Sequence, residues 1–104
     1  MYSKAEREQI ADTIVLQMGG RMFKAMTGVK KMVLLESGVR IFFKRTNGVK
    51  VNLVDIVLNA SDTYDMTFMR IHGGNVETIS EVDGVYCDML QDVFEKETGL
   101  FVRF

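Results

Sequence analysis

The chain has 104 residues, a length that suits one domain with one hydrophobic core and is too short for two. Hydrophobic residues make up 47% of the chain and charged residues 26%, which excludes an intrinsically disordered protein and predicts a single folded domain over residues 1–104. The formal net charge of −1 hides an asymmetry, because residues 21–50 carry eight Lys and Arg against one Glu, whereas residues 51–104 carry three against ten Asp and Glu.

The composition also excludes several kinds of site and location. A single Cys and a single His exclude an internal disulfide and a structural zinc site of the usual Cys and His type within one chain. The longest nearly uncharged stretch, residues 51–60, is about half as long as the roughly 20 residues of a membrane-spanning helix. The N-terminal segment 1–13 is charged and helical in pattern, without the apolar core of a signal peptide. We therefore expect a cytoplasmic protein with no membrane contact.

An amphipathic helix is predicted over residues 3–18. Ile10, Ile14 and Met18 recur at a spacing of four, as one face of a helix requires. Ser3 can cap its start, and Glu6 three residues later completes a capping box. The Gly pair at 19–20 can end it. Residues 21–28 fit either a short helical turn or an extended lead-in to a sheet.

From residue 31 onward, short runs rich in β-branched and aromatic residues predict an antiparallel meander of about five strands. The strand at 49–58 changes the phase of its alternation between Leu53 and Val54, which predicts either a bulge near Leu53–Asp55 or burial of both faces, and hence a curled sheet. The expected strands are 31–36, 39–45, 49–58, 63–71 and 76–82, with turns at 37–38, 46–48, 60–62 and 73–75.

A second helix is predicted over residues 84–97 from a broad apolar stripe that includes Val85, Met89 and Val93. Asp83 can cap its start and Gly99 can close its end. Residues 100–104 are apolar enough to return to the core or to add an edge strand. The predicted fold class is α+β: an N-terminal helix, a curled antiparallel meander, and a C-terminal helix packed on the sheet.

No catalytic constellation is apparent, so we expect a protein that is not an enzyme and that needs no metal or cofactor. A nucleophile with a neighbouring base, or a metal with an open position, would be required. The lone His72 is interpreted as a turn or surface residue, and Cys87 as a small buried side chain. Asp55, Asp62, Asp65 and Asp83 could gather around a hard cation, but Asn59, Ser61 and Asp62 are better explained as turn formers.

The best candidate site is a basic β-hairpin in the middle of the chain. Because side chains alternate along a strand, Arg40, Phe42 and Lys44 should share one face, opposite the apolar residues Val39, Ile41 and Phe43. Cations that neutralise phosphate, beside a ring on which a base can stack, are typical of a surface that binds single-stranded nucleic acid. The alternative is that these cations only protect exposed strands from aggregation and that Phe42 lies under a helix. The candidate residues are Arg40, Phe42, Lys44, Arg45, Lys50, Lys30 and Lys31.

Four motifs, GGxxFxxMTG at 19–28, DTYD at 62–65, GVYxDxLxxxF at 84–94 and TGL at 98–100, resemble a family of small, functionally uncharacterised proteins of bacteriophages and other bacterial mobile elements. The resemblance spans most of the chain. It implies a bacterial or phage setting in the cytoplasm of the host cell, and it brings no catalytic residues.

The leading hypothesis is a non-enzymatic accessory module that binds single-stranded nucleic acid, or a protein acting on nucleic acid, through the basic hairpin. The alternative is a protein-interaction or inhibitor module directed at a host protein. In one version of that alternative the chain forms a homo-oligomer, in which the basic middle of one copy meets the acidic second half of another.

Overall fold

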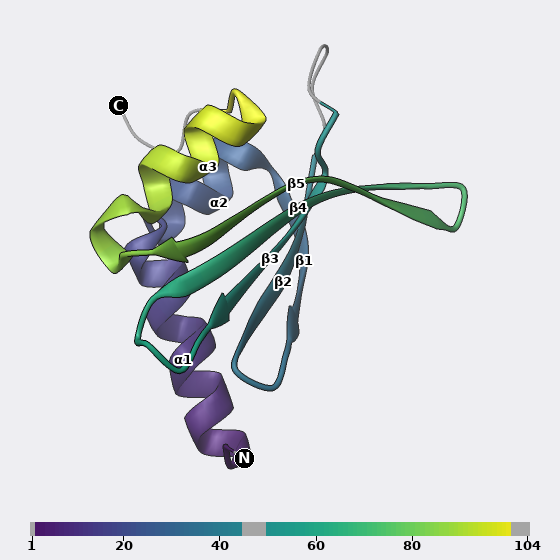
Figure 1. Cartoon of the computed structure of the whole chain (residues 1–104). Coiled ribbons are helices and arrows are strands. Elements are labelled where there is room, and N and C mark those ends of the chain that lie inside the picture. The colour runs from purple at the N-terminus through teal and green to yellow at the C-terminus, as the bar shows by residue number, and fades with distance from the viewer. Residues whose placement is uncertain (1, 45–49, 101–104) are drawn as a thin grey trace.

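The computed structural model describes residues 2–44 and 50–100, and these form one open five-stranded sheet with helices on one of its faces (Figure 1). The α+β fold class predicted from the sequence is confirmed. None of the described helices is long and apolar enough to cross a membrane. The elements in chain order are α1 (Lys4–Gln17), α2 (Arg21–Thr27), β1 (Val29–Leu34), β2 (Gly38–Phe43), β3 (Leu53–Leu58), β4 (Tyr64–His72), β5 (Asn75–Val85), the 3₁₀ turn η1 (Cys87–Met89) and α3 (Leu90–Thr98).

The sheet is an antiparallel meander in which each strand pairs with the next along the chain, so that β1 and β5 form its two edges. β4 and β5 are longer than the other three strands, and the turn that joins them projects beyond the rest of the sheet (Figure 1). The predicted meander is therefore confirmed for the described strands. The Asn-Gly turn expected at 46–48 lies outside the described residues.

The core lies between the helices and the sheet face that they cover. Phe94 of α3 is at its centre, with ring centroids 5.4 Å from Phe23 of α2 and from Phe43 of β2, and 6.3 Å from Phe68 of β4. The pairs with Phe23 and Phe43 are edge to face, and such pairs add to the free energy of apolar burial. Leu100 packs against the same core, and the rest of the C-terminal segment, 101–104, is outside the described residues.

The N-terminal helix forms as its sequence predicts. Ser3 Oγ accepts a hydrogen bond from Glu6 N at 3.2 Å, and Glu6 Oε1 accepts one from Ser3 N at 3.1 Å, which completes the capping box. The following segment, for which the sequence allowed two conformations, is the helix α2. It ends at Gly28, whose φ of 64° lies in the left-handed region that favours glycine.

The start of the C-terminal helix differs from the prediction. Residues 81–85 continue β5, because Glu81, Val82 and Val85 pair with β4. Asp83 therefore lies in a strand and does not cap a helix, and α3 begins only at Leu90. Cross-strand pairing over a distance along the chain has overridden a local capping signal. Gly99 ends α3 in the left-handed conformation, as predicted.

The phase change in the third strand is explained by burial of both faces. Leu53 is 1% exposed and Val54 is completely buried, although they point to opposite sides of β3. The pairing of β3 with β2 and with β4 has no register shift, so the alternative of a bulge near Leu53–Asp55 is wrong. The register shifts of the sheet lie between β1 and β2 and between β4 and β5.

Candidate nucleic-acid interface

Four exposed lysines lie at one end of the sheet. Val29 of β1 pairs with Phe43 of β2, and Phe43 N donates a hydrogen bond to Asn52 O at 3.0 Å, so these three residues lie side by side at this end. Each of the four lysines is within two residues, along the chain, of one of these three. We call this group the lysine end; it consists of Lys30, Lys31, Lys44 and Lys50.

Local backbone contacts hold the lysine end together. Lys44 N donates hydrogen bonds to the carbonyl oxygens of Thr27 and Gly28, at 3.3 and 3.0 Å, and so joins the end of β2 to the end of α2. Asn52 makes two side-chain hydrogen bonds to the backbone of Ile71, donating to its carbonyl at 3.0 Å and accepting from its N–H at 2.8 Å. The β4–β5 hairpin is thereby fixed beside the lysine end.

Arg40 is engaged within the sheet. It pairs with Asp55 directly opposite on β3, where Nε and Nη2 donate to the two carboxylate oxygens at 2.8 and 2.9 Å. Hydrogen bonding to Asp55 raises the pKa of Arg40. This bidentate geometry uses both the charge and the fork of donors that a phosphate would require. Sequence reasoning assigned Arg40 to nucleic acid because it did not pair the residue with Asp55, fifteen positions away.

Phe42 lies on the predicted side of β2, on the face that the helices leave uncovered. Val39, Ile41 and Phe43 are buried in the core, whereas Phe42 is half-buried and lies outside that core. Phe42 lies directly opposite Leu53 of β3, which is 1% exposed, and Leu53 in turn lies opposite Met69 of β4, which is 7% exposed. The ammonium group of Lys31 lies 5.9 Å from the ring centroid, a cation–π distance. One side of the ring is therefore occupied by a lysine.

The other residues that the sequence analysis singled out lie in strands and turns. His72 lies exposed at the end of β4, and Cys87 lies exposed in η1, so the prediction that Cys87 is buried is wrong. Asn59 Oδ1 accepts hydrogen bonds from Ser61 N and Thr63 N, which confirms the turn interpretation of this segment. Over residues 2–44 and 50–100, no three His, Cys, Asp or Glu side chains gather as metal ligands would.

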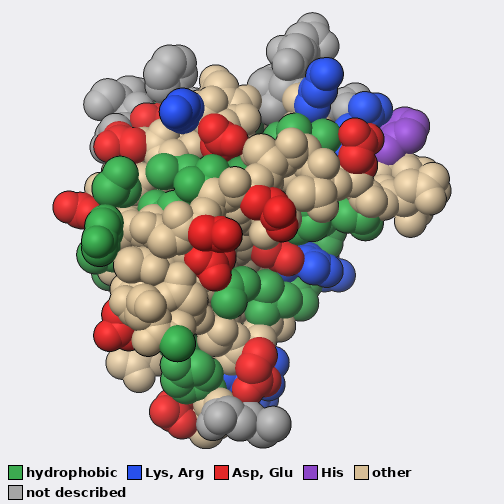
Figure 2. Space-filling view, in the orientation of Figure 1, with side chains coloured by type: hydrophobic (Ala, Val, Ile, Leu, Met, Phe, Trp, Pro, Cys, Tyr) green, Lys and Arg blue, Asp and Glu red, His purple; other side chains and the backbone are tan. Residues whose placement is uncertain are grey.

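The surface charges of the described residues are mixed on the face that Figure 2 shows. Lys and Arg side chains lie near the top, at the right edge and in the lower part, and Asp and Glu side chains lie beside them and over the centre. Sequence reasoning did not include Arg70, which follows Met69 on β4 and lies opposite Glu77 of β5. The predicted meander already placed the fourth strand beside the third, and that neighbourhood could have added Arg70 to the candidate residues. Arg45 is outside the described residues.

Comparison of the chain with protein-family models, with curated proteins and with solved structures found no match. The resemblance to mobile-element proteins remains a prediction. The motif residues on which it rests have structural roles here. Phe23 and Phe94 pack edge to face in the core, and Asp65 Oδ1 accepts hydrogen bonds from Asn59 Nδ2 and Gly84 N.

Proposed function

We propose that the protein is a non-enzymatic accessory module that binds single-stranded nucleic acid through its lysine end. The observation that carries the proposal is the grouping of four exposed ammonium groups at one end of the sheet, with no carboxylate paired to them in the part of the chain that the structure describes. Lysines that bind phosphate release condensed counterions, which supplies most of the free energy of contacts that do not depend on sequence. The proposed setting is the cytoplasm of a bacterial host that carries a phage or mobile element.

The lysines are better suited to this role than Arg40 and Phe42. Arg40 would have to leave Asp55 before it could contact a phosphate, and the charge of the pair is already balanced. Phe42 would have to lose the ammonium group of Lys31 from one side of its ring before a base could stack there. The proposed interface is therefore electrostatic, with weak dependence on base identity.

Fluorescence anisotropy with a labelled oligothymidine of about 20 nucleotides tests the proposal. We expect binding at low salt that weakens steeply as salt is added. Replacing Lys44 and Lys50 with Gln should lower the magnitude of the salt slope by about 0.7 for each lost phosphate contact. A parallel titration with oligouridine compares DNA with RNA.

The matched control is Lys4→Gln, which removes the same charge from the first turn of α1, at the other end of the sheet. Its binding curve and salt slope should equal those of the unmodified protein. The absence of binding at low salt, or an equal loss in Lys4→Gln and in the single variants Lys44→Gln and Lys50→Gln, would rule out an interface at the lysine end.

A second candidate function, self-association through the edges of the sheet, is favoured by the charges of those edges. β1 carries the exposed Lys30 and Lys31, and β5 carries the exposed Glu77, Glu81 and Asp83. Opposite charge on the two edge strands of the described sheet would favour pairing of one copy with the next. Light scattering over a range of protein and salt concentrations tests this function, which a monomer under all conditions would exclude.

A further inference from the structure

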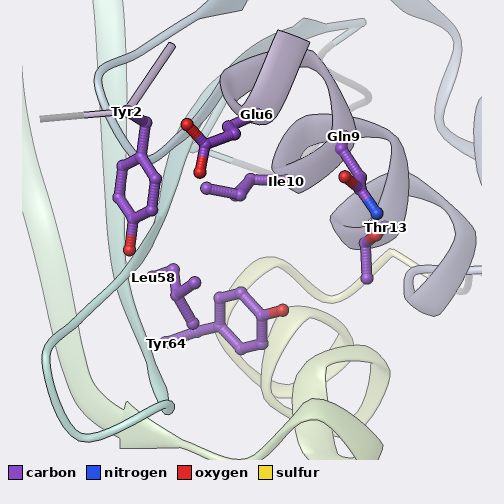
Figure 3. Close-up of a pocket in the computed structure, with 7 residues that line it drawn as sticks. All are labelled: Tyr2, Glu6, Gln9, Ile10, Thr13, Leu58 and Tyr64. Atoms are coloured by element: carbon purple, nitrogen blue, oxygen red, sulfur yellow. The ribbon is translucent and has the colours of Figure 1, made fainter.

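A groove of about 270 Å³ lies between the first half of α1 and the turn that joins β3 to β4, at the end of the sheet opposite the lysine end (Figure 3). Its sides are formed by two aromatic rings, Tyr2 before α1 and Tyr64 at the start of β4. Ile10 and Leu58 supply apolar surface between them. The polar side chains that line it, Glu6, Gln9 and Thr13, all come from α1.

The groove is built into the fold. Leu58 and Tyr64 face each other across β3 and β4, so their positions are set by the sheet. The start of α1 is held against the β1–β2 loop by two hydrogen bonds. Tyr2 N donates to Glu36 Oε1 at 3.3 Å, and Arg7 Nε donates to the carbonyl oxygen of Leu35 at 3.2 Å.

The charge of the groove is negative. Hydrogen bonds from Ser3 lower the pKa of Glu6, so its carboxylate is ionised at neutral pH. Only Oε1 is used by the capping box, and a carboxylate has further acceptor sites (Figure 3). Burial raises the pKa of Tyr64, with the nearby Cys87 and Asp62 as further causes, so its phenol is neutral. No Lys or Arg of the described chain lines the groove.

We propose that this groove binds an arginine side chain presented by a segment of a partner protein. A guanidinium group is planar, stacks on aromatic faces and donates hydrogen bonds in a fork that matches a carboxylate. Tyr2, which is 40% exposed, offers an aromatic face, and Tyr64, which is 6% exposed, lines the groove as a mostly buried ring. Glu6 offers the carboxylate, and Gln9 and Thr13 offer further acceptors. The proposed site is independent of nucleic-acid binding, because it uses other residues at the other end of the sheet.

The test is a titration of the isotope-labelled protein with the peptide acetyl-Ala-Arg-Ala-amide, followed by ¹H–¹⁵N correlation spectra. The comparison peptide carries citrulline, which has the shape of arginine without its charge. We expect saturable shifts at millimolar peptide that are confined to the first half of α1 and to residues near Leu58 and Tyr64, with a much weaker response to citrulline. Equal responses to the two peptides, or shifts that map elsewhere, would overturn the proposal.

Two variants separate binding from folding. Glu6→Gln removes the charge and keeps the capping box, because Gln can also accept from the backbone of Ser3, and it should weaken binding of the arginine peptide about fivefold or more. Glu8→Gln removes the same charge from an exposed position of α1 that does not line the groove, and binding should be unchanged.

Tyr2→Leu, which keeps apolar bulk without an aromatic face, should also weaken binding. Unchanged affinity in both Glu6→Gln and Tyr2→Leu would overturn the assignment of the site. If chemical shifts of the same residues change with protein concentration in the absence of peptide, the groove binds a second copy of this chain and the proposal of a partner protein is overturned.

Discussion

Phe42→Ala should lower the free energy of unfolding by about 2 kcal/mol, which is more than a typical surface substitution costs and less than truncation of a core Phe costs. A fully buried Phe side chain contributes about 1.5–3 kcal/mol of transfer free energy, and Phe42 is half-buried, so its own loss is about 1–1.5 kcal/mol. Truncation also uncovers Leu53, which lies directly opposite Phe42 on β3 and is 1% exposed. The exposure of Leu53 adds the remainder.

Urea denaturation measures this change, with Phe43→Ala as the control. Phe43 points to the core beside Phe94, so its truncation should cost about 3–5 kcal/mol. For Phe42→Ala we expect an unchanged m-value and a drop in melting temperature of about 10 °C.

A destabilisation of Phe42→Ala below about 0.5 kcal/mol, or one equal to that of Phe43→Ala, would refute this account of the helix-free face. A loss of about 1–3 kcal/mol in binding to oligothymidine without destabilisation would instead indicate a base stacked on the Phe42 ring.

Three further predictions concern the sheet. Gly38→Ala should cost about 3 kcal/mol in urea denaturation, because an added Cβ would collide with the carbonyl oxygen of Ile56, and near-normal stability would contradict that close approach. Asp55→Asn should cost about 1 kcal/mol and release Arg40, so anisotropy titrations should show tighter oligothymidine binding with a steeper salt slope, whereas unchanged binding would place Arg40 outside the interface. The pKa of Tyr64 is raised in the folded protein, so the stability that comes from its neutral phenol is complete below about pH 10 and is lost as pH rises through the folded pKa. Tyr64→Phe should therefore lose less melting temperature than the unmodified protein between about pH 10 and pH 11. An identical loss of melting temperature in both proteins would exclude this cause.

Short-range signals in the sequence were sufficient for α1 and for the order of the strands. The Ser3–Glu6 capping box lies within one helical turn, so the residues that form it are already close in any helical conformation. Turn residues between short β-branched runs leave adjacent antiparallel pairing as the simplest sheet. The grouping of cations at one end of the sheet follows from that order, because the start of β1, the end of β2 and the start of β3 meet there.

The sequence could not show which cations are already neutralised. Whether Arg40 faces Asp55 depends on the register of β2 on β3, and a shift of one residue would place them on opposite faces. The local sequence does not fix this register, because Leu53 and Val54 place buried apolar side chains on both faces of β3, and the register is a property of the whole sheet.

Contacts between distant parts of the chain decided the remaining features. Residues 83–85 are part of β5 because Val85 pairs with Tyr64 of β4, even though Asp83 and the apolar stripe predict the start of a helix there. The groove exists only because the packing of α1 on the sheet brings Tyr2 and Glu6 beside Tyr64. Local sequence sets the conformations that a segment prefers, but pairing and packing energies summed over many distant contacts choose among them, and they alone determine which side chains meet.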